Sequence, residues 1–152
     1  MKRVIAGIIL IVLSGYFALF VKEYIDRRNP EHAVAKITVT ADNQPVAAKL
    51  YGYYWHFSFG GDVEVAAPEI SEIYELGIPA TEVRGGERLE VVFSHTPDYL
   101  FINRSNEAYS YSFSAAEDEP YVPFLPGTYV YEVFAGFERG IVSYYFVIVV
   151  TG

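Results

Sequence analysis

The chain contains no cysteine among its 152 residues, and its only methionine is Met1. Without cysteine there are no disulfide bonds, no lipid-acylated cysteine and no thiol nucleophile. The copper centres of electron-transfer proteins, which depend on a cysteine thiolate, are excluded for the same reason. A chain that is exported without cysteine fits a bacterial envelope better than a eukaryotic secretory pathway.

Basic residues are scarce after residue 30, where seventeen acidic side chains face only six basic ones. The net charge of this part is therefore −11. A domain this acidic is repelled by nucleic-acid phosphates and by anionic lipid headgroups. We expect neither nucleic-acid binding nor peripheral binding to lipid.

Clusters of catalytic or metal-binding residues are also missing from the sequence. His56 and His95 lack the short spacing that would bring two imidazoles onto one zinc ion. Ser94 and His95 are neighbours, so in a strand their side chains would point to opposite faces and could not form a triad with Asp98. The acidic segment 117–119 is followed by proline rather than by the glycine bend of a calcium loop. We predict a protein that is not an enzyme and needs no metal or cofactor.

The most informative feature that is present is an uncharged run of eighteen residues, Val4 to Val21. As a helix it would be about 27 Å long, close to the hydrocarbon thickness of a bilayer. A cleaved signal peptide is the alternative, but its apolar core is shorter, about 7–15 residues, and ends at a small-x-small site. The nearest such triplet, residues 33–35, lies beyond several charged residues. We predict an uncleaved transmembrane anchor.

The orientation of this anchor depends on the basic residues on its two sides, whose numbers are similar. Lys2 and Arg3 precede the run, whereas Lys22, Arg27 and Arg28 follow it, which slightly favours the opposite orientation. Long domains after a first span are nevertheless exported largely regardless of charge. We expect a single-pass protein of the cell membrane with residues 1–22 as anchor, 23–33 as linker and 34–152 as an extracytoplasmic domain.

Hydrophobic residues after residue 33 alternate with a period of two, the pattern of β-strands. In the segment from Lys49 to Phe59 the alternation places five aromatic residues on one face: Tyr51, Tyr53, Trp55, Phe57 and Phe59. Further strands are predicted at Val34 to Ala41, Leu89 to Phe93, Tyr99 to Asn103, Tyr109 to Ser114, Thr128 to Phe137 and Ile141 to Val150.

These short strands, separated by frequent turn signals, predict an all-β fold, an antiparallel β-sandwich of Ig-like or cupredoxin-like type. The segment 138–140 should close a hairpin, and the apolar final strand should be central or covered. One short helix is expected from Pro68 to Leu76, ended by Gly77.

The stretch Gly127-Thr128-Tyr129-Val130-Tyr131 resembles the G-x-Y-x-C strand of immunoglobulin domains, with Tyr131 in place of the cysteine. The resemblance implies that Tyr129 is a tyrosine corner and that Trp55 is the buried tryptophan of the third strand. Together with the segments 93–97 and 140–150, this pattern is similar to small membrane-anchored and lipoprotein domains of Bacillus-type bacteria, a family that implies fold and location but no activity.

A second, weaker resemblance would imply copper binding, which this chain cannot perform. The segment 52–57, the sequence Gly77-Ile78-Pro79-Ala80 and the later Pro126-Gly127-Thr128-Tyr129 are similar in order to the cupredoxin domain of cytochrome oxidase subunit II. Those domains bind copper through His, Cys and Met, whereas this chain has no cysteine and no methionine besides Met1. The resemblance therefore implies at most a metal-free relative.

Two groups of residues are candidates for ligand or partner contact. Tyr53, Tyr54 and Trp55 could form an aromatic platform for a glycan or peptide, although packing in the core is the favoured explanation for them. Their counterpart is acidic: Glu69, Glu72 and Glu75 share one face of the expected helix and are either solvated or an acidic contact patch. The sequence thus predicts a non-catalytic interaction module or accessory subunit of an envelope complex, with a glycan- or peptide-binding module as the alternative.

Overall fold

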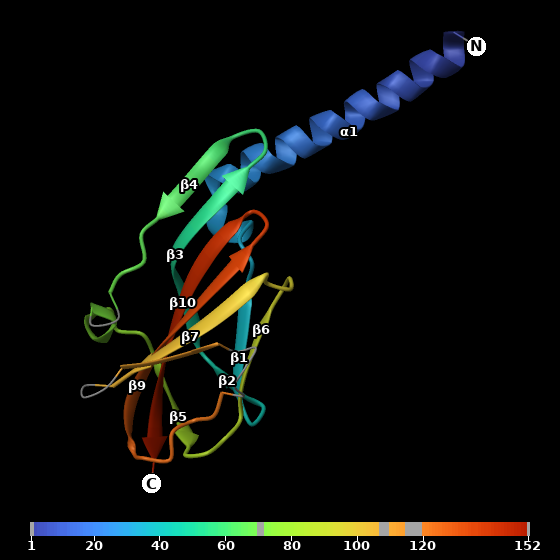
Figure 1. Cartoon of the computed structure of the whole chain (residues 1–152). Coiled ribbons are helices and arrows are strands. Elements are labelled where there is room, and N and C mark those ends of the chain that lie inside the picture. Colours follow the sequence, from blue (N-terminus) through green and yellow to red (C-terminus); the bar gives the residue numbers. More distant parts are fainter. Residues whose placement is uncertain (1, 70–71, 107–109, 115–119, 152) are drawn as a thin grey trace.

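The structure is a computed structural model that describes residues 2–69, 72–106, 110–114 and 120–151. It consists of one long N-terminal helix and an all-β domain whose strands are mainly antiparallel (Figure 1). The helix projects from one end of the β domain, and the C-terminus lies at the other end. The expected all-β fold class with one N-terminal helix is confirmed.

Helix α1 spans Lys2–Arg28 and is long and apolar enough over Val4–Arg28 to cross a membrane. Its apolar side chains from Val4 to Phe20 are exposed, and none of its most apolar stretch is buried inside the protein. The helix continues past the expected anchor boundary at residue 22, so the first part of the predicted linker is helical. It stops before Pro30, which opens a short 3₁₀ turn, η1 (Pro30–His32).

The smaller sheet has three strands in the order β2-β1-β6. These are β1 (Ile37–Ala41), β2 (Gln44–Val46) and β6 (Leu89–Phe93). Asp42 and Asn43 connect β1 to β2 with φ angles of 42° and 72°. Asp and Asn tolerate this left-handed conformation better than most residues, and a two-residue hairpin loop of this kind matches the twist of its strands.

The larger sheet has the order β4-β3-β10-β9-β7-β8, and β5 pairs in parallel with β10. Along its whole length β10 is hydrogen-bonded to β9; on its other side it pairs first with β3 and then with β5. The prediction of a central or covered final strand is therefore confirmed. The strands are β3 (Ala48–Phe57), β4 (Gly61–Val65), β5 (Ala80–Arg84), β7 (Tyr99–Ser105), β8 (Ser110–Ser114), β9 (Gly127–Phe137) and β10 (Gly140–Thr151).

The two sheets share one hydrophobic core. Val39 and Leu89 of the small sheet belong to the same buried cluster as Trp55, Tyr131 and Phe146 of the large sheet. The rings of Tyr131 and Phe146 stack with centroids 4.7 Å apart. Burial of these large apolar side chains from both sheets is what holds the sheets together.

A β-bulge in β3 interrupts the alternation predicted for this strand. The pairing with β10 shifts between Ser143 and Tyr144, which leaves Tyr51 as the extra residue. Tyr51 therefore points to the outer face, the side of the large sheet away from the small one, where its ring packs against Tyr145. The prediction of one common aromatic face is correct for three residues of the shared core: Tyr53, Trp55 and Phe57. It is wrong for Tyr51 and for Phe59, which follows the end of β3 and is exposed.

The predicted tyrosine corner has the expected contact, since the hydroxyl of buried Tyr129 donates to the carbonyl oxygen of Leu125 at 3.0 Å. Trp55 is buried as predicted, but its strand β3 pairs with β10 and not with β9, which carries Tyr129. In immunoglobulin domains the third strand pairs with the strand of the tyrosine corner. The proposed equivalence of Trp55 to that third-strand tryptophan is therefore wrong.

Three observed strands were not predicted, and one predicted helix is not observed as an α-helix in its described part. Strands β2, β4 and β5 were not expected. The segment predicted as a helix from Pro68 to Leu76 forms only a 3₁₀ turn, η2 (Glu72–Glu75), within its described part. Buried Ile73 and Ile78 anchor this segment on the outer face of the large sheet, so packing decides its shape.

Candidate functional site

The junction between α1 and the β domain is fixed by the carboxylate of Glu23. One oxygen accepts a hydrogen bond from the backbone N–H of Phe59 at 2.8 Å, and the other pairs with the guanidinium of Arg139 at 2.8 Å. Arg139 also donates to the carbonyl oxygen of His56 at 3.1 Å. One helix residue therefore ties together the turn after β3 and the turn between β9 and β10.

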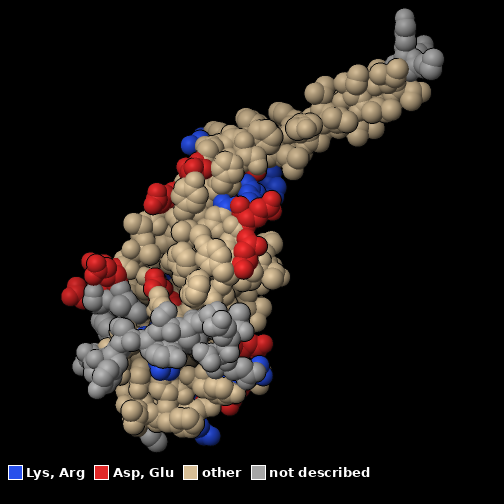
Figure 2. Space-filling model, in the orientation of Figure 1, with Lys and Arg blue, Asp and Glu red and all other residues tan. Residues whose placement is uncertain are grey.

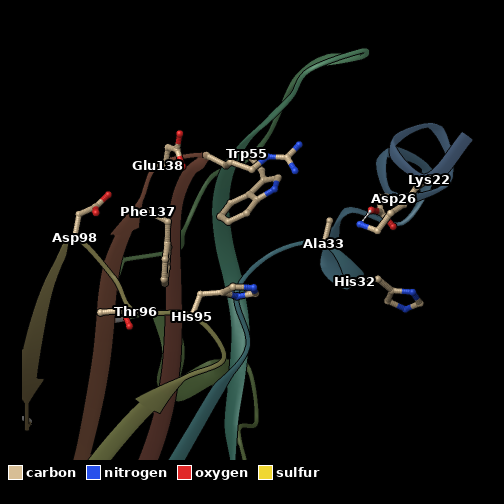
Figure 3. Close-up of a pocket in the computed structure, with 11 residues that line it drawn as sticks. Lys22, Asp26, His32, Ala33, Trp55, His95, Thr96, Asp98, Phe137 and Glu138 are labelled. Atoms are coloured by element: carbon tan, nitrogen blue, oxygen red, sulfur yellow. Dashed lines mark hydrogen bonds and ion pairs between the residues drawn. The ribbon is translucent and has the colours of Figure 1, made fainter. Parts of the chain in front are cut away.

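A pocket of about 590 Å³ lies at this junction (Figure 3). Lys22 and Asp26 of α1 form part of its wall and pair with each other at 3.0 Å. Trp55 of β3 and Phe137 of β9 supply an aromatic wall, with ring centroids 6.1 Å apart. The pocket therefore combines an aromatic wall with the Lys22–Asp26 ion pair.

The loop between β6 and β7 contributes His95, Thr96 and Asp98 to the same pocket. The hydroxyl oxygen of Ser94 lies 3.0 Å from Nδ1 of His95, so the prediction that these side chains point apart is wrong. Both residues follow the end of β6 and lie in a bend, where strand alternation no longer applies. The same hydroxyl accepts the backbone N–H of Lys36 at 3.0 Å, which gives Ser94 a structural role.

Metal binding finds no support in the described residues, among which no group of three or more His, Asp or Glu side chains could hold an ion. The indole nitrogen of Trp55 is buried without a hydrogen-bond partner, although the ring borders the pocket. The acidic segment 117–119 lies outside the described residues.

His56 belongs to a surface network on β3 and β4. Its Nδ1 lies 2.7 Å from a carboxylate oxygen of Asp62, and the hydroxyl of Tyr54 donates to the other oxygen. These two hydrogen bonds lower the pKa of Asp62. His56 lies directly opposite Asp62 in the pairing of β3 with β4, and Tyr54 lies diagonally from it, so both are cross-strand contacts that stabilise the hairpin.

The predicted platform residues are separated by the fold. Tyr53 and Trp55 lie in the shared core, and only Tyr54 is exposed, on the opposite face of β3. Their side chains therefore do not form one surface. Core packing accounts for Tyr53 and Trp55, while Tyr54 belongs to the network around Asp62.

The predicted acidic residues lie together at the surface near η2. Glu69, Glu72 and Glu75 are all exposed. A carboxylate oxygen of Glu72 accepts the backbone N–H of Glu69 at 3.0 Å, a helix-start contact of capping-box type. The local structure uses Glu72 to begin the turn and leaves the other two carboxylates facing solvent.

An exposed aromatic cluster that the sequence analysis did not single out lies on the outer face of β7 and β9. It consists of Tyr99, Phe101 and Phe134, which we call the outer aromatic cluster. Tyr99 stacks on Phe134 with centroids 6.0 Å apart and contacts Phe101 at the same distance. Tyr99 and Phe101 remain more than two-fifths exposed.

A glycine makes room for this cluster. Tyr99 faces Gly136 in the pairing of β7 with β9, and any side chain at 136 would collide with the tyrosine ring. The signal that could have revealed the cluster was the alternation of Tyr99 and Phe101 with Leu100 and Ile102. Alternation alone, however, does not say which face is open.

Polar side chains border the outer aromatic cluster. Asn103 donates to the carboxylate of Glu132 at 2.8 Å, and Tyr145 donates to the other oxygen of Glu132 at 2.7 Å. Aromatic rings next to fixed amide and carboxylate groups are typical of surfaces that bind a protein or a glycan. Comparison with known proteins adds no assignment: no family model, no curated protein and no solved structure matches this chain.

Proposed function

We propose that this chain is a single-pass protein of a bacterial cell membrane whose extracytoplasmic Ig-like sandwich is a non-catalytic interaction module, an accessory subunit of an envelope complex. The observation that carries the proposal is the outer aromatic cluster, an exposed group of rings on a rigid sheet. Aromatic residues are enriched at protein interfaces because they bury a large area at a small cost in side-chain entropy.

The anchor is supported by the length and the uniform exposure of the apolar part of α1. A helix that is apolar on all sides is stable only inside a protein or inside a membrane, and this one is not covered by protein. The Ig-like assignment is supported by two sheets around one core and by the Tyr129 contact, while the pairing of β3 with β10 departs from the immunoglobulin strand order.

The position of the outer aromatic cluster favours a partner that is itself held at the membrane. Phe134 lies five residues before Arg139, which contacts the end of α1. At about 3.3 Å per strand residue, the cluster is roughly 15 Å from the junction. A neighbouring membrane protein can reach this height with a short extracytoplasmic segment.

The test is crosslinking of the full-length protein in intact cells, followed by solubilisation and identification of what copurifies with a C-terminal tag. We expect one dominant membrane protein, lost from the Phe101→Ser variant and retained by Phe124→Ser. Phe124 is the matched control because it is 81% exposed and lies outside the cluster. Equal recovery with both variants would contradict the proposed contact surface, and Glu72→Gln with Glu75→Gln tests the acidic patch separately.

A glycan-binding module is the second candidate, favoured by the Asn103–Glu132–Tyr145 network beside the rings. Sugar recognition combines ring stacking with fixed hydrogen-bonding groups. Binding of the full-length protein in detergent to purified envelope glycan, lost on Tyr99→Ser, would favour this function. Absence of binding together with a stoichiometric protein partner would exclude it.

A further inference from the structure

The turn between β3 and β4 lies against the end of the apolar helix. The ring of Phe59 in this turn meets the ring of Phe20 in α1, with centroids 5.8 Å apart and planes inclined by 68°. Gly60 leaves space for the side-chain stem of Arg27, since any side chain there would collide with it. With the Glu23 contact to the Phe59 N–H, the turn is attached to the helix at three points.

Phe59 is exposed although it is a large apolar residue with a fixed backbone. About half of its side chain, 48%, is open, and the Phe20 ring beside it is equally exposed at 46%. Polar residues are the usual choice at the tip of a hairpin. A phenylalanine held against the uncharged helix, and not turned into the core, needs another apolar environment.

The depth of Phe59 follows from the helix. Phe20 is the second-last residue of the uncharged run, so it lies about 3 Å along the axis from Lys22, the first charged residue. Lys22 sits at the hydrocarbon boundary if Val4 to Val21 fill the bilayer, and Phe59 lies at the level of Phe20. Aromatic residues are favoured at this boundary.

We propose that the Phe59 turn is a second membrane contact, in which the tip between β3 and β4 dips into the boundary between headgroups and acyl chains beside the anchor. This inference rests on the membrane anchoring proposed above. It fixes the domain at two points, so the domain keeps a set height and tilt above the bilayer. The outer aromatic cluster is then presented in one orientation to neighbouring membrane proteins.

The charges at the junction permit this contact despite the acidity of the domain. Lys22 and Arg139 line the junction pocket, and Arg27 lies against Gly60 in the turn. Figure 2 shows basic and acidic side chains close together where the helix meets the β domain. Glu23 is neutralised by Arg139, and Asp26 by Lys22. These two ion pairs reduce the repulsion expected between an acidic domain and anionic headgroups at the end that would touch the membrane.

The absence of cysteine makes the test direct, because a single spin label can be placed on the otherwise native full-length chain. Phe59→Cys is labelled and reconstituted in phosphatidylcholine vesicles, and collision with oxygen, which dissolves in lipid, is compared with collision with a water-soluble nickel chelate. Phe17→Cys in the apolar run is the control for insertion. Phe124→Cys, at the other end of β9, is the control for water. Ser58→Cys repeats the measurement with the Phe59 ring intact.

We expect the labels at 58 and 59 to collide several-fold more with oxygen relative to nickel than the label at 124, and to approach the label at 17. A water-like label at 59 with an inserted label at 17 would overturn the second contact and leave the anchor standing. A water-like label at 17 would overturn the anchor and the contact together. Circular dichroism of each variant confirms that the β domain is folded.

Discussion

Two buried tyrosine side chains hold loop segments against the core of the β domain. The hydroxyl of Tyr144 donates to the carbonyl oxygen of Ala35 at 2.9 Å and so holds the segment that leads from α1 into β1. Tyr129 fixes the approach to β9 in the same way through Leu125. In both cases the ring is buried and the hydroxyl satisfies a backbone group, which stabilises a loop that has no strand partner.

The buried tyrosines give the protein a predictable response to alkali. Burial raises the pKa of Tyr144 to about 12, from 10.0 in an exposed tyrosine, and burial does the same for Tyr131. The folded state therefore holds these protons more tightly than the unfolded state. The stability from each group is complete below pH 10 and is lost as the pH rises from about 10 through about 12.

We expect Tyr144→Phe to lower the free energy of unfolding at pH 7 by about 1 kcal/mol, because one buried hydrogen bond is lost. Between pH 10 and 12 the variant should lose stability less steeply than the wild type, since one titrating group is gone. Urea unfolding of the full-length protein in detergent, repeated across this pH range, measures both effects. Parallel pH curves for the two proteins would refute the assignment.

At the scale of elements, the hairpin of β9 and β10 connects the core to the helix. Its turn ends at Gly140, where φ is 155° and an added Cβ would collide with the carbonyl oxygen of Tyr54. The close approach allows Arg139 to exchange backbone and side-chain hydrogen bonds with His56 and to reach Glu23. Gly140 is therefore needed for the close approach of β10 to β3 as well as for the turn.

Gly140→Ala should destabilise the protein by about 1–3 kcal/mol, the usual cost of forcing an extra group into a packed site. Gly15→Ala, in the exposed helix with nothing near the added group, is the matched control and should leave the β domain unchanged. Thermal unfolding followed by the near-ultraviolet signal of Trp55 reports on the β domain alone. Equal midpoints for the two variants would show that β3 yields to the added methyl group.

At the scale of the whole molecule, charge is distributed unevenly between the chain's two parts. The β domain is strongly acidic, whereas basic residues flank the apolar run on both sides. Lys2 and Arg3 favour retention of the N-terminus in the cytoplasm, and Arg27 and Arg28 oppose export of the domain. The orientation is a balance that a few substitutions can shift.

We predict that a membrane-impermeant maleimide labels Phe124→Cys in intact cells, as the proposed extracytoplasmic location of the domain requires. Adding Lys2→Gln and Arg3→Gln should reduce the labelled fraction, and adding Arg27→Gln and Arg28→Gln should preserve or increase it. Labelling only after cells are broken would place the domain in the cytoplasm and contradict the proposed location.

The sequence by itself determined the apolar helix, the all-β class, the last hairpin and the central position of β10. The first three follow from local periodicity. The central position of β10 follows because a strand that is apolar on both faces would aggregate if its edge were exposed. The short strands β2, β4 and β5 were not predicted because a few residues are too short a segment to show a clear alternation. The Asp42–Asn43 pair was a usable signal for the first of them.

Only the tertiary structure decided which aromatic residues are open. The bulge at Tyr51 reverses the faces of β3 only up to that residue. The packing of the small sheet buries Tyr53 and Trp55, while the outer aromatic cluster stays exposed. The position of Phe59 beside Phe20 likewise depends on a contact between residues far apart in the chain. Alternation divides a strand into two faces, but the choice of the buried face depends on the element that packs there, because burial is a property of contacts between distant segments.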